Sequence, residues 1–154
     1  MARIFRETNA DGLIECEATI EGGDQDSRPK LLSHARQIAN GRYLLDLPHS
    51  QIVLAAIRET CDFRRWELLA AHVRSTHVHL VADGFSDPDR TITDPKAYAS
   101  RALKRQTAEP HQSKYWARGG STRALFAVES VNAAIKYVVD QQGSAMAVYT
   151  SDRG

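Results

Sequence analysis

The stretch S-T-H-V-H-L-V-A-D-G, residues 75–84, holds two histidines one residue apart in an apolar run. Side chains of a β-strand alternate between its two faces, so His77 and His79 share one face, and Val78 and Leu80 point to the other. The apolar run W-E-L-L-A-A-H-V comes just before it, and R-S-T makes a tight connection between the two. The pattern predicts a β-hairpin with two imidazoles on one face. The tripeptide H-V-H is compatible with two half-exposed strand residues and also with two ligands of one metal ion. Taken alone, it is weak evidence for a metal site.

A second informative stretch is S-V-N-A-A-I-K-Y-V-V-D-Q-Q-G, residues 130–143. Its apolar residues recur at the spacing of one helical face, which predicts a core-facing helix that Ser130 begins and Gly143 ends. Tyr137 and Gln141 are four residues apart, so they lie on one side of this helix, at the flank of the apolar stripe. The stripe consists of Val131, Ala134, Ile135, Val138 and Val139.

These two elements together offer a distinct chemistry. Two neutral imidazoles, from His77 and His79, and an amide oxygen, from Gln141, make a mixed nitrogen and oxygen site for a divalent ion with open positions. Such an ion polarises a phosphodiester, and the Tyr137 hydroxyl can then attack the phosphorus to form a covalent phosphotyrosine. For each residue taken alone, packing or solvent exposure is the commoner role.

Length and composition set the frame for this chemistry. The chain has 154 residues, 42% of them hydrophobic and 25% charged, which suits one globular domain. It has no apolar run long enough to span a membrane and no apolar signal core near its start. Cys16 and Cys61 match no zinc or redox spacing, so we expect them to be reduced and unlinked in a cytoplasmic protein.

The net charge is only +1, but the charges are unevenly distributed along the chain. The first 30 residues are rich in acids, and residues 101–136 are rich in lysine and arginine. A basic half is compatible with phosphate contacts, although solvated surface charge is the simpler interpretation. The basic residues are Arg101, Lys104, Arg105, Lys114, Arg118, Arg123 and Lys136.

The remaining pattern predicts further elements. Ser50, after Pro48, is a plausible N-cap of one helix, and Asp94 with Pro95 begins a second helix that runs to about residue 106. Short strands are expected over 13–20, where polar and apolar residues alternate, and over 124–127.

With these residues in place, T-H-V-H-L-V and K-Y-V-V-D-Q together resemble the HUH single-tyrosine transposases, the insertion-sequence group that includes the REP-associated tyrosine transposases. W-A-R-G-G-S-T-R-A-L-F is similar to a loop in one branch of that family. The resemblance covers residues 44–143 of a single transposase-like domain spanning 1–154. It leaves a poorly matched N-terminal segment, 1–43, and a tail, 144–154. It implies an α+β fold, a ferredoxin-like or RRM-like antiparallel sheet with helices packed on one face.

The resemblance also implies an activity, HUH-type endonuclease and transposase chemistry. His77, His79 and Gln141 would hold Mg²⁺ or Mn²⁺. Tyr137 would cleave single-stranded DNA and leave a 5′-phosphotyrosine and a free 3′-OH, as in DNA transposition. The implied partners are single-stranded or hairpin DNA and a second copy of the chain in a homodimer.

Several residues outside this site are candidates for DNA contacts. The basic helix residues and the arginines flanking Gly119 and Gly120 suit a phosphate backbone, and an aromatic side chain suits an unpaired base. A surface or packing role is an equal alternative for each of them. These candidates are Arg101, Lys104, Arg105, Trp116, Arg118 and Arg123.

Two other functions stay open at this point. One is a non-catalytic DNA-binding remnant of a transposase, which the poorly matched segment 1–43 favours. The other is a small phosphoesterase that uses the histidine pair as acid and base, with His111 as a second motif.

Overall fold

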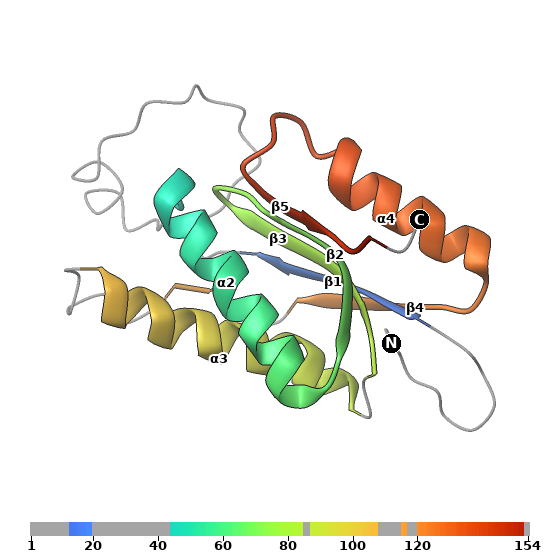
Figure 1. The fold of residues 1–154 in the computed structure, drawn as a ribbon, viewed down its shortest axis with the longest axis horizontal. Coiled ribbons are helices and arrows are strands. Elements are labelled where there is room, and N and C mark those ends of the chain that lie inside the picture. Colours follow the sequence, from blue (N-terminus) through green and yellow to red (C-terminus); the bar gives the residue numbers. More distant parts are fainter. Residues whose placement is uncertain (1–12, 20–43, 85–86, 108–114, 117–119, 153–154) are drawn as a thin grey trace.

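The computed structural model describes residues 13–19, 44–84, 87–107, 115–116 and 120–152, shown as ribbon in Figure 1. Along the chain, the elements are β1 (Leu13–Thr19), α2 (Leu47–Arg64), β2 (Glu67–Val73), β3 (His77–Asp83), α3 (Pro88–Gln106), β4 (Ser121–Leu125), α4 (Val128–Asp140) and β5 (Ala147–Thr150).

The strands of this described part form one sheet in the order β4-β1-β3-β2-β5, and each neighbouring pair is antiparallel. The run β1-α2-β2-β3-α3-β4 with the strand order 4-1-3-2 is the ferredoxin-like arrangement, to which α4 and β5 are added at the C-terminal end. The predicted α+β fold with an antiparallel sheet is therefore confirmed. The segment 1–43 contributes β1, which lies between β3 and β4 inside the sheet.

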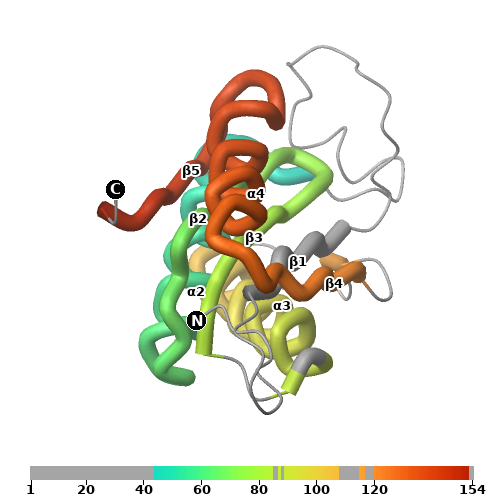
Figure 2. The backbone as a smooth tube through the Cα atoms, turned by 90° about the vertical axis from the view of Figure 1, so that its right-hand side faces the viewer, coloured from blue at the N-terminus to red at the C-terminus, as the bar shows by residue number. Residues whose placement is uncertain are grey.

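The two faces of the sheet are covered by different helices. Val78 and Leu80 of β3 share a small cavity with Ile57 of α2 and Ile92 of α3, so α2 and α3 pack on one face. The opposite face carries α4, whose Val138 carbonyl is hydrogen-bonded to His72 of β2. In Figure 2, α4 lies in front of β2 and β3, with α2 behind them. The prediction that helices pack on one face of the sheet therefore holds for α2 and α3, and α4 packs on the other face.

The predicted hairpin is present as β2 and β3. Residue His72 is paired with His79, and Val73 with Val78. The Arg74 amide donates to the His77 carbonyl at 2.8 Å and closes the turn. Because paired residues of an antiparallel ladder share a face, the register puts His72 beside His79 on the α4 side.

All three predicted helix starts lie too far along the chain. Helix α4 begins at Val128 with Ala127 as its cap, so Ser130 lies inside its first turn.

Helix α2 begins at Leu47, and its cap is Asp46, whose carboxylate accepts the His49 amide at 2.9 Å. Ser50 lies one turn inside, where its hydroxyl donates to the Leu47 carbonyl at 2.7 Å. Pro48 stands in the first turn of α2, where a missing amide hydrogen costs nothing.

Helix α3 begins at Pro88 with Asp87 as its cap, seven residues before the predicted start, so Pro95 lies inside it. Asp94, the predicted cap, instead forms an ion pair with Arg64 of α2, with 2.8 Å between Oδ2 and Nε. Both Asp-Pro pairs offer the same start signal, and the structure uses the first one.

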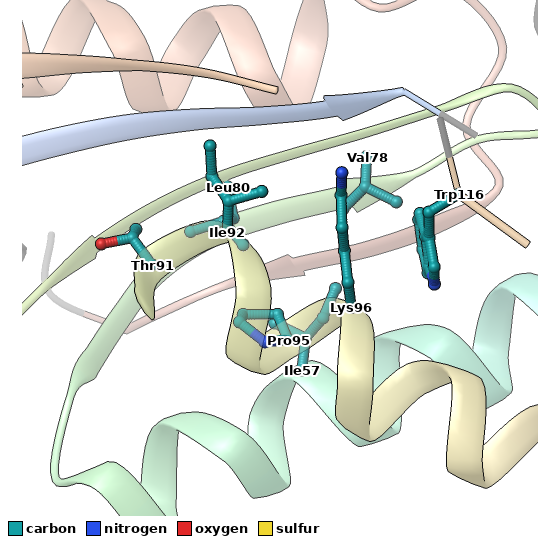
Figure 3. Close-up of a pocket in the computed structure, with 8 residues that line it drawn as sticks. All are labelled: Ile57, Val78, Leu80, Thr91, Ile92, Pro95, Lys96 and Trp116. Atoms are coloured by element: carbon teal, nitrogen blue, oxygen red, sulfur yellow. The ribbon is translucent and has the colours of Figure 1, made fainter. Parts of the chain in front are cut away.

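The core between the sheet and the helices α2 and α3 is tightly filled. Figure 3 shows its small cavity, which has a volume of about 20 Å³, the space of a single water. Lys96 rises from α3 toward the sheet beside Trp116, and burial lowers its pKa. Within the described ranges, no helix is both long and apolar enough to cross a bilayer.

Candidate active site

The two histidines of β3 form one wall of the candidate site. The rings of His77 and His79 are 6.1 Å apart between centroids and nearly parallel, at 16°. His79 is almost completely buried, with 5% of its surface exposed, whereas His77 is half-buried at the start of the strand. The alternation predicted from the sequence therefore places both imidazoles on the face that α4 covers.

Tyr137 supplies the opposite wall. Its ring centroid lies 6.0 Å from that of His79, and the two rings meet edge to face at 78°. Ala134 and Val138 of the same helix are buried against the sheet, and this fixes the side of α4 that faces β3. Tyr137 stands at the flank of that buried row and keeps 42% of its surface exposed. A substrate can therefore approach the phenol from solvent while the sheet holds the imidazoles beside it.

The two glutamines after Tyr137 differ sharply in their surroundings. Gln141 follows the last residue of α4 and is exposed, and its backbone amide donates to the Tyr137 carbonyl at 3.1 Å. Gln142 is buried, and its side-chain amide donates to the same carbonyl at 3.5 Å. Gln141 lies one helical turn after Tyr137, on the same side of α4. Its predicted role as a metal ligand stays a prediction.

Thr76 orients the first histidine. Its hydroxyl oxygen is 2.6 Å from Nδ1 of His77. A histidine whose Nδ1 is occupied by a neighbour presents Nε2 to a metal or a substrate, and such second partners are common at metal sites. The sequence showed Thr76 only as a turn residue, because a hydrogen bond between adjacent side chains leaves no pattern in the chain.

His72 is a third histidine of the hairpin, and it is buried. It lies in β2, it is fully buried, and both ring nitrogens have backbone partners. The Nδ1 atom is 3.1 Å from the Val138 carbonyl oxygen, and Nε2 accepts the Met146 amide at 3.3 Å. Because a carbonyl only accepts and an amide only donates, the ring is neutral with its proton on Nδ1.

The pKa of His72 leads to a prediction about stability. Burial lowers the pKa of His72 below the usual 6.5. The hydrogen bond to the Val138 carbonyl raises the pKa in part, and the charge of Arg74 lowers it. The folded state therefore binds fewer protons than the unfolded state below about pH 6.5, and the stabilisation from neutral His72 is lost as the pH falls. We expect the free energy of unfolding to fall between pH 7 and 5, with His72 contributing a slope of at most about 1.4 kcal/mol per pH unit.

Denaturant titrations of the wild type and of His72→Gln at several pH values measure this slope. Glutamine does not titrate, so the variant should show a flatter profile over the same range. Equal slopes in the two proteins would contradict the assignment, because the remaining titrating groups are common to both.

The predicted DNA-binding residues fall on two sides of the molecule. Arg101, Lys104 and Arg105 are exposed on α3, on the face of the sheet away from Tyr137, and the Arg101 guanidinium lies 4.6 Å from the Tyr98 ring centroid. Arg123 of β4 is exposed and pairs with Glu15, which in turn pairs with Val81. This register places Arg123 on the face of the histidine pair.

The aromatic candidate is less available for DNA than the exposed arginines. The Trp116 indole N–H donates to the Ser100 hydroxyl at 2.9 Å, and the ring lines the core cavity, so it packs against α3 (Figure 3). Tyr115, the aromatic residue next to it, is buried, and Trp116 itself is partly buried. Arg118 and His111 lie outside the described residues.

The donor set fits a divalent ion in its chemistry. Imidazole nitrogens are common ligands of such ions, and the rings of His77 and His79 are neighbours on one face of the sheet. The hydrogen bond from Thr76 is the kind of second partner that a ligating histidine has. In the part of the chain with described side chains, no group of three His, Cys, Asp or Glu residues gathers as a metal site.

Comparison with known proteins gives similarity in structure but not in sequence. The chain is similar in fold to a REP-associated tyrosine transposase bound to a REP hairpin, with a TM-score of 0.51 and 13% identity over 90% of this chain and 70% of that one. It is also similar to a proposed transposase from Deinococcus radiodurans, with a TM-score of 0.46 and 18% identity over 93% of this chain and 99% of that one. No protein-family model and no curated protein matches the sequence. At this identity, the first likeness establishes a shared fold.

Proposed function

We propose that the protein is a metal-dependent nuclease and strand-transferase for single-stranded DNA that works through a covalent 5′-phosphotyrosine, as in DNA transposition. The observation that supports this most is the placement of the Tyr137 ring 6.0 Å from His79, which in turn lies 6.1 Å from His77, within a single chain. The same three residues carry the sequence resemblance, and the fold is shared with a transposase that binds a DNA hairpin.

The chemistry follows from the arrangement of these side chains. The Tyr137 hydroxyl oxygen attacks the phosphorus of a DNA diester and loses its proton, and the bond from phosphorus to the 3′ oxygen breaks. The 3′ oxygen takes up a proton and leaves as a free hydroxyl. A divalent ion held by His77, His79 and Gln141 would supply Lewis-acid polarisation of the scissile phosphate. Because the phosphotyrosine keeps the energy of the broken diester, another 3′-OH can displace Tyr137 and restore a DNA strand.

The path of the DNA is constrained by the charges around the site. Arg123 lies on the same face as the histidine pair, two residues along β4 from Ser121, which is in the row of His79. We propose that it contacts a phosphate close to the scissile one. The cations of α3 lie on the other face, so DNA that touched both groups would have to cross an edge of the sheet. The homodimer stays a prediction.

The structure bears on both alternatives in part. The argument for a non-catalytic remnant relied on the poorly matched segment 1–43, and that segment supplies β1 in the interior of the sheet. The phosphoesterase hypothesis uses the histidine pair as acid and base, and its second motif, His111, lies outside the described residues. It gives no role to the exposed tyrosine that faces the histidine pair.

A test uses a pool of DNA hairpins with randomised single-stranded flanks, incubated with the protein and Mn²⁺ and run on a denaturing gel. Attack by Tyr137 joins the protein to the 5′-phosphate of the downstream fragment. A label at the 3′ end should therefore shift to the size of a protein adduct, whereas a label at the 5′ end should appear on a shorter free strand. Free cleavage products from both ends, with no adduct, would support the phosphoesterase instead.

The neighbouring glutamines provide a matched pair of variants. We expect Gln141→Ala to reduce adduct formation about 10- to 100-fold and to raise the Mn²⁺ concentration needed for half-maximal rate, because it removes a proposed ligand. Gln142→Ala removes a buried hydrogen bond and should lower the melting temperature without changing the Mn²⁺ requirement. Metal titrations of both variants measure the difference, and a reversed result would assign the ligand to Gln142.

A further inference from the structure

His72 occupies an unusual position relative to the proposed catalytic segment. After Tyr137, the chain completes α4 at Asp140 and enters β5 at Ala147. His72 is hydrogen-bonded to the backbone on both sides of this connection, through the Val138 carbonyl and the Met146 amide. The contact with Val138 spans 66 positions along the chain, and the contact with Met146 spans 74.

The bond to Val138 meets a need of the helix itself. The last carbonyls of a helix run out of helical partners, and Val138 lies in the last turn of α4. A neutral imidazole from the sheet supplies the donor, and its second nitrogen accepts the Met146 amide. Because the ring is fully buried and both nitrogens are engaged, it permits only a narrow range of positions for Val138. Tyr137 precedes Val138 directly, so its position is restricted as well.

The same histidine is also tied to the other half of the site. In the sheet, His72 is the register partner of His79, so the two residues lie side by side on the same face. The Tyr137 ring meets His79 from above this face. One residue of β2 thus contacts the strand that carries the imidazole pair and the helix that carries the phenol.

We infer that His72 is a positioning residue that sets the height and angle of Tyr137 over the histidine pair. The inference relies on the proposed function for its catalytic consequence, and on the two hydrogen bonds for its structural part. Small displacements of a reacting group cost much of the rate, on the order of 100-fold for about 1 Å. Loss of the two bonds should therefore slow the chemical step while DNA binding is retained.

Three variants test this inference. His72→Leu keeps a buried side chain and removes both hydrogen bonds. His72→Gln retains one donor and one acceptor in its amide, so it can rescue the geometry. Val73→Ala is the control, because Val73 is equally buried in the same strand but its side chain faces α2 and α3.

Two measurements distinguish positioning from simple destabilisation. One is the single-turnover rate of adduct formation at saturating hairpin DNA, next to the Kd for that DNA. The other is the hydrogen exchange of the Met146 amide by NMR. We expect His72→Leu to lose protection at Met146 and to react 10- to 100-fold more slowly at unchanged Kd. His72→Gln should recover most of the rate, and Val73→Ala should lower the melting temperature but leave the rate within about twofold.

A wild-type rate in His72→Leu, or an equal loss of rate in Val73→Ala, would overturn the inference. Failure of the proposed function gives a different result, in which the wild type forms no adduct. In that case the exchange of Met146 still decides the structural part, since selective loss of protection in the leucine variant supports it and preserved protection refutes it.

Discussion

Tyr137→Phe should abolish covalent attachment to single-stranded DNA, with no adduct detectable on a denaturing gel where the wild type gives a clear band. The phenol oxygen is the proposed nucleophile, and phenylalanine has no atom that can form the bond to phosphorus. The ring contact with His79 does not require the hydroxyl, so the fold and the DNA affinity should be preserved. Gel shifts under native conditions and thermal melting measure these two properties.

The matched control for this change is Tyr149→Phe. Tyr149 lies in β5, half-buried, with the Arg58 guanidinium 5.0 Å from its ring centroid. Loss of its hydroxyl should leave adduct formation at the wild-type level. An adduct that persists in Tyr137→Phe and disappears in Tyr149→Phe would contradict the assignment and point to Tyr149 of β5 as the nucleophile, and peptide mapping of the labelled residue would check this.

The second large effect is expected from the histidine pair. His77→Ala with His79→Ala should remove the binding of Mn²⁺ measured by calorimetry with the metal alone. It should also lower adduct formation at least about 100-fold, because Lewis-acid stabilisation is worth several kcal/mol. The hairpin β2–β3 should still form, since His77 lies at the start of its strand and the core residues Val78 and Leu80 are unchanged.

His49→Gln is the control for loss of an imidazole elsewhere. His49 lies in the first turn of α2 and is bonded to the Asp46 cap, far along the chain from the proposed site. Its substitution should leave both Mn²⁺ affinity and adduct formation unchanged. Wild-type Mn²⁺ affinity in the double alanine variant would show that the histidine pair is not the metal site.

The parts of the fold that the sequence predicts well are those in which local pattern and tertiary packing agree. The alternation around His77 and His79 gives the hairpin and its faces, and the apolar spacing on either side of Tyr137 gives α4. The start of α3 could not be predicted in this way, because Asp87 and Asp94 are both followed by proline and look the same locally. Only the contact of Asp94 with Arg64 of α2 distinguishes them, and that contact depends on how two helices pack.

The candidate site shows the same division. Spacing predicts that His77 and His79 share a face and that Tyr137 stands at the flank of its helix, and the structure brings these three rings together, whereas their roles and that of Gln141 stay predictions. The role of His72 depends on the register between β2 and β3 and on the path of the chain after α4, and neither is written in the local sequence. The choice between Gln141 and Gln142 has the same origin, since a helix that ends at Asp140 exposes one and buries the other.

The two walls of the site are anchored to unequal degrees. Strand β3 is hydrogen-bonded to β1 on one side and β2 on the other, whereas α4 is held by side-chain packing and by the bond from His72. On warming, α4 should therefore unfold before β3, so the strand and its two imidazoles stay in place at first. Such a partly melted protein would keep two of the three proposed metal ligands but would have displaced the proposed nucleophile.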